Sequence, residues 1–172
     1  MLRKVFLEPL RPEHETELLA AVERSRTLHA AWVQPPSSHE AFADYIAARS
    51  SLRTAVRTEA GDLAAVINVN EIVLGTFRSA YLGFYALVPH EGHGYVRAGL
   101  LRIIDAAFAG EGLHRLEANV QPTNERSLRL VRSLGLREEG FSPRYLNIAG
   151  AWRDHVRFAI TVEEWPGRAR DG

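Results

Sequence analysis

One glycine-bearing segment has the residue types of an anion site. Residues 91–96 read Glu-Gly-His-Gly-Tyr-Val, between a stretch that predicts a strand and one that predicts a helix. Glycine lets the backbone close around a bulky anion, and the first turn of a helix presents unpaired N–H groups with partial positive charge. These features suit a pyrophosphate. An ordinary strand-to-helix turn explains the same residues, because Gly-x-Gly alone is a weak signal and neither a P-loop nor a dinucleotide fingerprint is present.

A second polar segment opens the next predicted helix. Asn124 is well suited to cap that helix, and Ser127 lies one turn further along on the same side. Simple capping explains Asn124 without any ligand. The strand before this helix, at residues 115–120, alternates in character, so that its apolar residues share one face and Glu117 and Asn119 share the other.

The rest of the chain predicts the elements that position these segments. Apolar residues recur at helical spacing in four stretches, at 13–28, 38–51, 94–108 and 125–134. Seven shorter stretches predict strands, at 5–10, 52–59, 63–74, 80–88, 115–120, 137–148 and 151–161. Three of these strands follow one another directly, which favours antiparallel pairing. The order of elements predicts an α+β or mixed layer fold, not a repeating βα array.

Composition excludes several classes of function. The 172 residues suggest one domain, and 21 basic against 21 acidic residues argue against a general polyanion binder. No cysteine is present, which excludes disulfides and cysteine nucleophiles, and the scattered histidines predict no metal site. No apolar stretch approaches the length of a membrane helix, and the N-terminus lacks the pattern of a signal peptide. We therefore expect a cytoplasmic location.

Three motifs in order resemble one group of enzymes. Residues 83–165 contain GFYALVPHEGHGY, then HRLEANVQPTNERSLRLVRSLGLREEG, then YLNIAGAWRDHVRFAIT and EEW. This text resembles the RimJ/RimL group of ribosomal-protein-alanine N-acetyltransferases within the GNAT superfamily, and VINVNEIVLG upstream is similar too. The resemblance implies a single GNAT domain over residues 1–172. Its expected fold is α+β, with a mixed, mostly antiparallel central sheet of about seven strands flanked by about four helices.

The resemblance also implies how acetyl-CoA would be held. The strand that ends near residue 88 resembles the one whose backbone pairs with the pantetheine arm, and residues 92–97 resemble the pyrophosphate loop. Asn124 matches an asparagine that bonds the pantetheine region, and Ser127 matches a serine near the CoA sulfur. The expected CoA-binding residues are Leu87, Val88, Gly92, His93, Gly94, Tyr95, Val96, Arg97, Asn124 and Ser127. Arg129 and Arg132 could meet the CoA phosphates or equally form a solvated basic face.

Four residues depart from the superfamily pattern. The pattern Gln/Arg-x-x-Gly-x-Gly/Ala reads here Glu91-x-x-Gly94-x-Val96. Glu91 places a negative charge beside the expected phosphate, and Val96 is larger than the usual small residue. The family's Glu-Ala pair further into the helix reads here Ala98-Gly99, and Gly99 costs about 1 kcal/mol of helix propensity relative to alanine.

The acetyl transfer that the resemblance implies requires three catalytic groups. The attacking amine must lose a proton, the thioester carbonyl needs a hydrogen-bond donor, and the leaving thiolate needs a nearby hydroxyl. Ser127 is the candidate hydroxyl, and a backbone N–H on the edge at Leu87 and Val88 is the candidate donor. Glu71 and Glu117 are the candidate bases, although each could equally form a structural ion pair.

The expected acceptor slot is lined by aromatic and amide side chains. Tyr85, Tyr145 and Asn119 are the candidates, although Tyr145 could equally pack in the core. An asparagine cannot act as a base, so Asn119 would position a water. His93 could touch a phosphate, although an exposed loop histidine is the commoner outcome, and His155 is expected to be structural.

The expected activity is acetyl transfer from acetyl-CoA to a primary amine, with no metal. The favoured acceptor is the N-terminal α-amino group of a protein, with a ribosomal protein as a candidate partner. One alternative is an acetyltransferase for a small amine such as an antibiotic, an amino sugar or a polyamine. The other is a GNAT-shaped module that binds acyl-CoA without catalysis. No acidic cluster for a polyamine is visible, no nucleic-acid or membrane partner is expected, and the chain is expected to be a monomer or homodimer.

Overall fold

A seven-stranded sheet organises residues 3–166, the part of the chain that the computed structural model describes. The strands are β1 (Phe6–Pro9), β2 (Leu52–Arg57), β3 (Leu63–Val73), β4 (Ser79–Ala86), β5 (Arg115–Val120), β6 (Arg137–Ile148) and β7 (Ala151–Thr161). Their order across the sheet is β1-β2-β3-β4-β5-β7-β6. Every pair is antiparallel except β4 with β5, which confirms the expected mixed, mostly antiparallel sheet.

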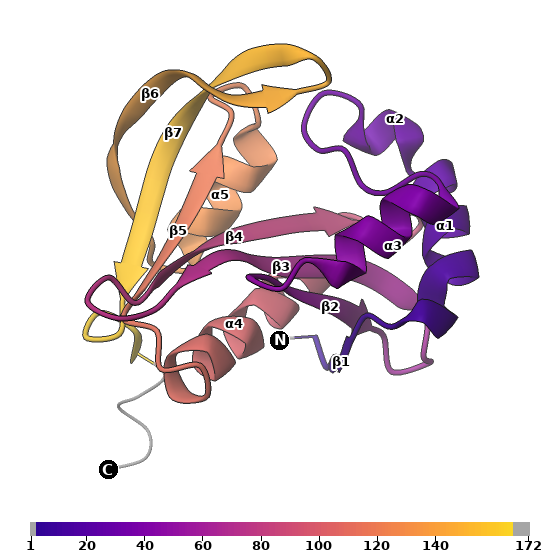
Figure 1. The fold of residues 1–172 in the computed structure, drawn as a ribbon, viewed down its shortest axis with the longest axis horizontal. Helices are drawn as coiled ribbons and strands as arrows, with labels where there is room; N and C mark the ends of the chain where they lie inside the picture. Colours follow the sequence, from indigo (N-terminus) through magenta and orange to yellow (C-terminus); the bar gives the residue numbers. More distant parts are fainter. Residues whose placement is uncertain (1–2, 167–172) are drawn as a thin grey trace.

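Five α-helices and one short 3-10 helix surround the sheet in the described part of the chain. They are η1 (Pro12–His14), α1 (Glu15–Arg24), α2 (Arg26–His29), α3 (His39–Ala47), α4 (Tyr95–Ala109) and α5 (Glu125–Ser133). Figure 1 shows α1, α2 and α3 gathered at one end of the molecule and the β6–β7 hairpin arching toward them. No helix within residues 3–166 is long and apolar enough to cross a membrane.

The two faces of the sheet bury different helices. Along β3, alternate residues such as Ala65 and Ile67 pack in the core that includes α4 and α5. Val66, which points to the other face, packs in a second core with Leu18 of α1 and Phe42 of α3. The alternation of a strand thus divides the apolar residues between two layers, and β3 lies between helices on both sides.

The strands β4 and β5 separate part-way along their length. They pair only from Ser79 to Leu82 of β4 and from Arg115 to Ala118 of β5. Beyond these residues β4 continues along β3 to Ala86, while β5 continues along β7 to Val120. The sheet therefore opens between its two central strands, as Figure 1 shows.

The predicted helix at 13–28 is broken in two, which is why five α-helices stand where about four were expected. Ser25 interrupts it, and its hydroxyl donates a hydrogen bond to the carbonyl of Ala21 at 2.7 Å. The same oxygen accepts from the N–H of Val88 at 2.9 Å. A serine that bonds both the preceding turn and a distant strand end favours a break in the helix. The helix predicted to reach 51 ends at Ala47, and the strand predicted to reach 88 ends at Ala86.

Candidate active site

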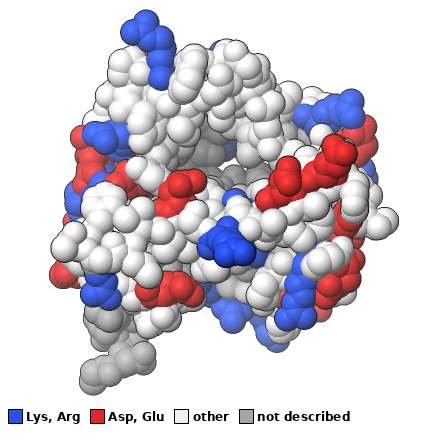
Figure 2. Space-filling view, viewed as in Figure 1, with Lys and Arg blue, Asp and Glu red and all other residues white. Residues whose placement is uncertain are grey.

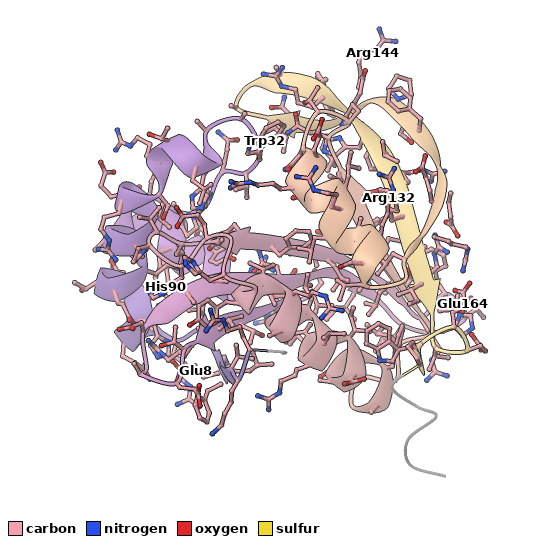
Figure 3. All side chains as sticks on the ribbon, turned by 180° about the vertical axis from the view of Figure 1, so that it is seen from behind. Glu8, Trp32, His90, Arg132, Arg144 and Glu164 are labelled. Atoms are coloured by element: carbon pink, nitrogen blue, oxygen red, sulfur yellow. The ribbon has the colours of Figure 1, made fainter. Side chains whose placement is uncertain are left out.

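The gap between β4 and β5 opens into a cleft of about 950 Å³. Its wall is made by the second half of β4, the turn before α4 and the first turn of that helix, and the end of β5 with the loop that follows it. The first half of α5, α2 with the loop after it, and one residue of β7 complete the wall. Figure 2 shows a hollow in the centre of one face, with a largely uncharged rim above it. Seen from behind in Figure 3, Trp32 lies beside the gap between the N-terminal helices and α5.

The entrance to α4 provides a backbone anion site. Gly94 caps the helix at φ +86°, and Gly92 before it has φ +77°, so both adopt the left-handed conformation that glycine tolerates best. The helical bonds begin at the N–H of Ala98, which donates to the carbonyl of Gly94. The N–H groups of the three preceding residues, 95–97, therefore have no acceptor within the helix. Both glycines and residues 95–97 line the cleft.

Two of the residues that depart from the superfamily pattern, Val96 and Glu91, lie at this entrance. Val96 is half-buried and packs against the core under α4, while its backbone stays in the first turn. Glu91 is half-buried on the cleft wall, and its Oε2 is shielded from water without a hydrogen-bond partner among residues 3–166. His93 does not line the cleft. Its carbonyl accepts from Nε of Arg3 at 3.0 Å.

The backbone N–H groups of Leu87 and Val88, expected to bond the thioester carbonyl, are not free, so the donor must come from other residues of β4. The N–H of Leu87 donates to Ala64 at 2.9 Å and that of Val88 donates to Ser25. Both donors are therefore occupied, and neither residue lines the cleft. Backbone N–H groups alternate between the two edges of a strand, so those of Phe84 and Ala86 point to the edge that β5 has left. Both of these residues line the cleft.

The start of α5 faces the same cleft from the other side. The side-chain oxygen of Asn124 accepts from the N–H of Ser127 at 3.1 Å, so the predicted cap is present. Both residues line the cleft, and Ser127 is half-buried there. Arg129 also lines it but pairs with Glu125 at 3.1 Å.

The two carboxylates considered as bases lie off the cleft wall. Glu117 is only 7% exposed and accepts from Nε of Arg115 at 2.9 Å, and Arg115 also pairs with Glu139. Glu71 is exposed at an irregular position of β3 with φ +49°. Neither lines the cleft, so neither can reach an amine placed there without rearrangement. Asn119 does line it, with its Oδ1 shielded and unpartnered among residues 3–166.

The two candidate tyrosines take different positions. Tyr85 lines the cleft, and its hydroxyl lies 3.5 Å from that of Tyr45 on α3. Burial raises the pKa of Tyr85 well above its ordinary value, and the nearby Tyr45 adds to this. Tyr145 on β6 does not line the cleft. Its ring lies 6.0 Å from that of His155, which does.

Two buried histidines lie on the wall: sequence reasoning missed His29 and expected His155 to be structural. His29 is 4% exposed, with Nε2 at 2.7 Å from the carbonyl of Ala86, and His155 is 3% exposed. Burial lowers the pKa of each imidazole, and a backbone hydrogen bond partly opposes this. No local pattern marks His29, because it reaches the cleft only through the helix break at Ser25.

The acetyltransferase (GNAT) domain family matches residues 4–137 of the chain. The chain belongs to this family. As a GNAT domain it is 37% identical over 108 residues to "[Ribosomal protein uS5]-alanine N-acetyltransferase" of Escherichia coli K12, covering 62% of this chain and 56% of the relative. The chain thus spans about half the length of the curated relatives that it matches.

Solved structures support the same GNAT fold. "Mycobacterium smegmatis RimJ in complex with CoA-disulfide" is 28% identical, with a TM-score of 0.86 over 94% of this chain and 84% of that one. Spermidine N-acetyltransferase from Vibrio cholerae, in complex with CoA and spermine, is 21% identical, with a TM-score of 0.77 over 93% and 96%. At that identity the second likeness concerns the fold alone.

Proposed function

We propose that this GNAT domain transfers an acetyl group from acetyl-CoA to a primary amine, most readily the N-terminal α-amino group of a protein. One observation carries the proposal. The separation of β4 from β5 brings a free backbone edge, the amide-lined entrance of α4 and the Ser127 hydroxyl onto a single cleft.

The residues on the cleft wall suit the parts of acetyl-CoA, which supplies an activated acetyl thioester. The N–H groups at the start of α4 bind the diphosphate, with Arg97 and Arg126 beside them on the wall. The free edge of β4 pairs with the amide groups of the pantetheine arm. The N–H of Phe84 stabilises the carbonyl oxygen as negative charge develops, and the Ser127 hydroxyl stabilises the leaving sulfur.

The charge of the wall favours a peptide N-terminus over a polyamine as the acceptor. Among residues 3–166 the carboxylates that line the cleft are Glu91 and Glu125, both at the starts of α4 and α5. The opposite end is lined by neutral aromatic and amide groups, with two buried histidines: Trp32, Tyr85, Asn119, Gln121, His29 and His155. A polyamine carries several positive charges that this end leaves unpaired. The 37% identical E. coli relative, named for acetylating a ribosomal protein on alanine, supports the same choice.

Two alternatives make different predictions. A small-amine acetyltransferase would release free thiol from acetyl-CoA with polyamines, amino sugars or antibiotics. The fold shared with the Vibrio cholerae spermidine enzyme is the reason to include such amines in the test. A non-catalytic module would bind CoA and release no thiol with any amine. A cytoplasmic location, a single domain over 1–172 and a monomeric or homodimeric state stay predictions.

The decisive experiment incubates the protein with acetyl-CoA and a panel of acceptors, and detects free thiol. The panel contains peptides with N-terminal alanine, the same peptides with a blocked N-terminus, spermidine and an aminoglycoside. We expect thiol release with the free N-terminal alanine peptide and none with the blocked one. Release with spermidine alone would overturn the peptide assignment, and CoA binding without any release would leave a binding module.

Replacing Ser127 by alanine is expected to lower turnover far more than it weakens CoA binding. The hydroxyl would act on the sulfur mainly as charge develops there, so its loss affects the transition state more than the bound ground state. Steady-state kinetics give kcat, and calorimetry gives the Kd of CoA. Ser133→Ala, at an exposed serine of the same helix, serves as the matched control. An unchanged kcat in the Ser127 variant would remove this hydroxyl from the mechanism.

A further inference from the structure

Among residues 3–166, no carboxylate lines the end of the cleft that contains Trp32, Tyr85 and Asn119, the proposed acceptor end, but an imidazole with one unpaired ring nitrogen does. His155 is on β7 and is 3% exposed. Its Nδ1 lies 2.9 Å from the carbonyl oxygen of Arg153. A carbonyl only accepts hydrogen bonds, so Nδ1 carries the hydrogen and Nε2 keeps its lone pair. Within the described residues Nε2 has no hydrogen-bond partner, and His155 lines the cleft.

The sheet register places this imidazole beside Asn119. Asn119 pairs with Arg157 across β5 and β7, and His155 lies two residues from Arg157 on the same strand. Residues two apart on a strand share a face, so His155 and Asn119 face the same side as diagonal neighbours. Both line the cleft, as Phe84 does, and Asn119 directly follows Ala118, the last residue of β5 that pairs with β4.

We propose that Nε2 of His155 is the group that accepts the proton of the acceptor amine, a role that rests on the proposed acetyl transfer. As the new C–N bond forms, one N–H proton passes to Nε2. The C–S bond breaks with its electron pair on sulfur, which takes a proton from solvent beside the Ser127 hydroxyl. The imidazolium then returns its proton to solvent, so the products are an acetamide and a free thiol.

His29 on the opposite wall is the strongest competitor, and its geometry suits the role less well. Its Nε2 lies 2.7 Å from the carbonyl of Ala86, so Nδ1 holds the lone pair. That Nδ1 is shielded within the protein, whereas Nε2 of His155 is not among the shielded atoms. We assign to His29 the positioning of the end of β4, through the bond to Ala86.

The groups around His155 affect the basicity of its imidazole, and hence which amines it can deprotonate. The charged and titratable groups around it are Asp154, Arg157 and Tyr145, with His29, Arg126 and Glu125 on the other parts of the wall. Burial lowers the pKa of His155, and the bond to Arg153 and the charge of Asp154 partly oppose this. An N-terminal amine titrates near 8 and a lysine or polyamine amine near 10.4. A weakly basic imidazole therefore favours the N-terminal amine.

The test compares His155→Asn with His29→Gln. Asparagine can keep a donor near the position of Nδ1, and glutamine can keep one near Nε2, so each variant preserves the backbone bond and removes the lone pair. We expect His155→Asn to lower kcat with an N-terminal alanine peptide by about a hundredfold and to leave the Kd of CoA within twofold. The control His114→Asn, at an exposed histidine that pairs with Glu163, is expected to retain wild-type kcat.

A second readout does not depend on turnover. An NMR titration of the free protein follows the histidine signals, and the signal absent from His155→Asn identifies this imidazole. We expect its pKa to lie below 6.5 and to coincide with the acidic limb of the wild-type kcat/KM profile, a limb that the variant loses. An unchanged limb in His155→Asn, or a larger loss of kcat in His29→Gln, would overturn the assignment. Thiol release by the wild-type protein decides the proposed function separately.

Discussion

At the scale of single residues, Glu91 opposes the ligand that its own loop would bind. Its carboxylate is half-buried on the cleft wall, with Oε2 shielded and unpartnered within the described chain. A negative charge near a diphosphate raises the free energy of the bound state, and reduced contact with water weakens the screening. The loop is therefore expected to bind CoA less tightly than its backbone geometry permits.

Replacing Glu91 by glutamine should tighten CoA binding. Removing a like charge at this range changes the binding free energy by roughly 1 kcal/mol, or about fivefold in Kd. Calorimetric titration with CoA measures the change. Glu111→Gln, at an exposed residue just beyond the end of α4, removes the same charge away from the loop and should leave Kd unchanged. Equal Kd values for wild type and Glu91→Gln would place the diphosphate elsewhere.

The residues that the sequence could predict are those with a local pattern. Gly94 and Asn124 begin helices, so their backbone roles could be predicted from the residues next to them. The pairing of Glu139 with Arg115 and the position of His155 beside Asn119 depend on strand register. Contacts of that kind join distant parts of the chain, and no local pattern specifies them.

At the scale of elements, Gly99 shows why a weak helix former stands inside α4. A Cβ built there would lie 2.7 Å from Cδ1 of Ile67 and 2.8 Å from Cγ2 of Val56. Atoms that close cannot coexist without movement, so α4 approaches β2 and β3 only because this position has no side chain. The departure that looked like a loss of helix propensity in the sequence is explained by packing.

Replacing Gly99 by alanine should destabilise the protein in spite of the better helix propensity. Overpacking costs about 1–3 kcal/mol and the propensity gain is about 1 kcal/mol, which leaves a net loss of about 1 kcal/mol. Urea denaturation measures the free energy of unfolding. Ile67→Val removes the closest methyl group, so the double variant should recover part of the loss relative to Ile67→Val alone. A more stable Gly99→Ala protein would contradict this account.

The helix break at Ser25 could not be predicted from the spacing of apolar residues. Apolar spacing predicted one helix over 13–28, and two helices form because the Ser25 hydroxyl bonds both Ala21 and the N–H of Val88. The second of these partners is 63 residues away along the chain. A pattern of neighbouring residues contains no information about it. The same break turns α2 toward the end of β4 and brings His29 to the cleft.

At the scale of the whole molecule, two hydrogen bonds join the parts that the opening of the sheet separates. Nε2 of Gln121, after β5, donates to the carbonyl of Ala31 at 2.9 Å. The N–H of Ala149, at the tip of the β6–β7 hairpin, donates to Oε1 of Gln34 at 2.9 Å. Figure 1 shows this hairpin arching toward the loop between α2 and α3. These bonds attach the loop after α2, which lines the cleft together with α2, to the other half of the sheet.

The buried histidines of the cleft make stability depend on pH in a mildly acidic range. In the folded protein, burial lowers the pKa of His29 and His155, whereas in the unfolded chain both titrate near 6.5. Between these values the unfolded chain binds more protons, so the free energy of unfolding falls as pH drops below about 6.5. The carboxylate of Glu139 affects the free energy of unfolding only at lower pH. The bonds to Arg115 and Arg137 lower the pKa of Glu139 from 4.5 to about 2, so its contribution is lost only below about pH 4.5.

Urea denaturation at about pH 7.5, 6.0 and 5.0 should therefore show a free energy of unfolding that declines before the contribution of Glu139 is lost. His29→Gln removes one of the two buried imidazoles and keeps a donor for the Ala86 carbonyl, so its decline should be shallower than that of the wild type. His114→Asn, at an exposed histidine, should follow the wild-type curve apart from the weak ion pair to Glu163. A free energy of unfolding that stays constant down to about pH 5 would contradict the burial of the two imidazoles in the folded protein.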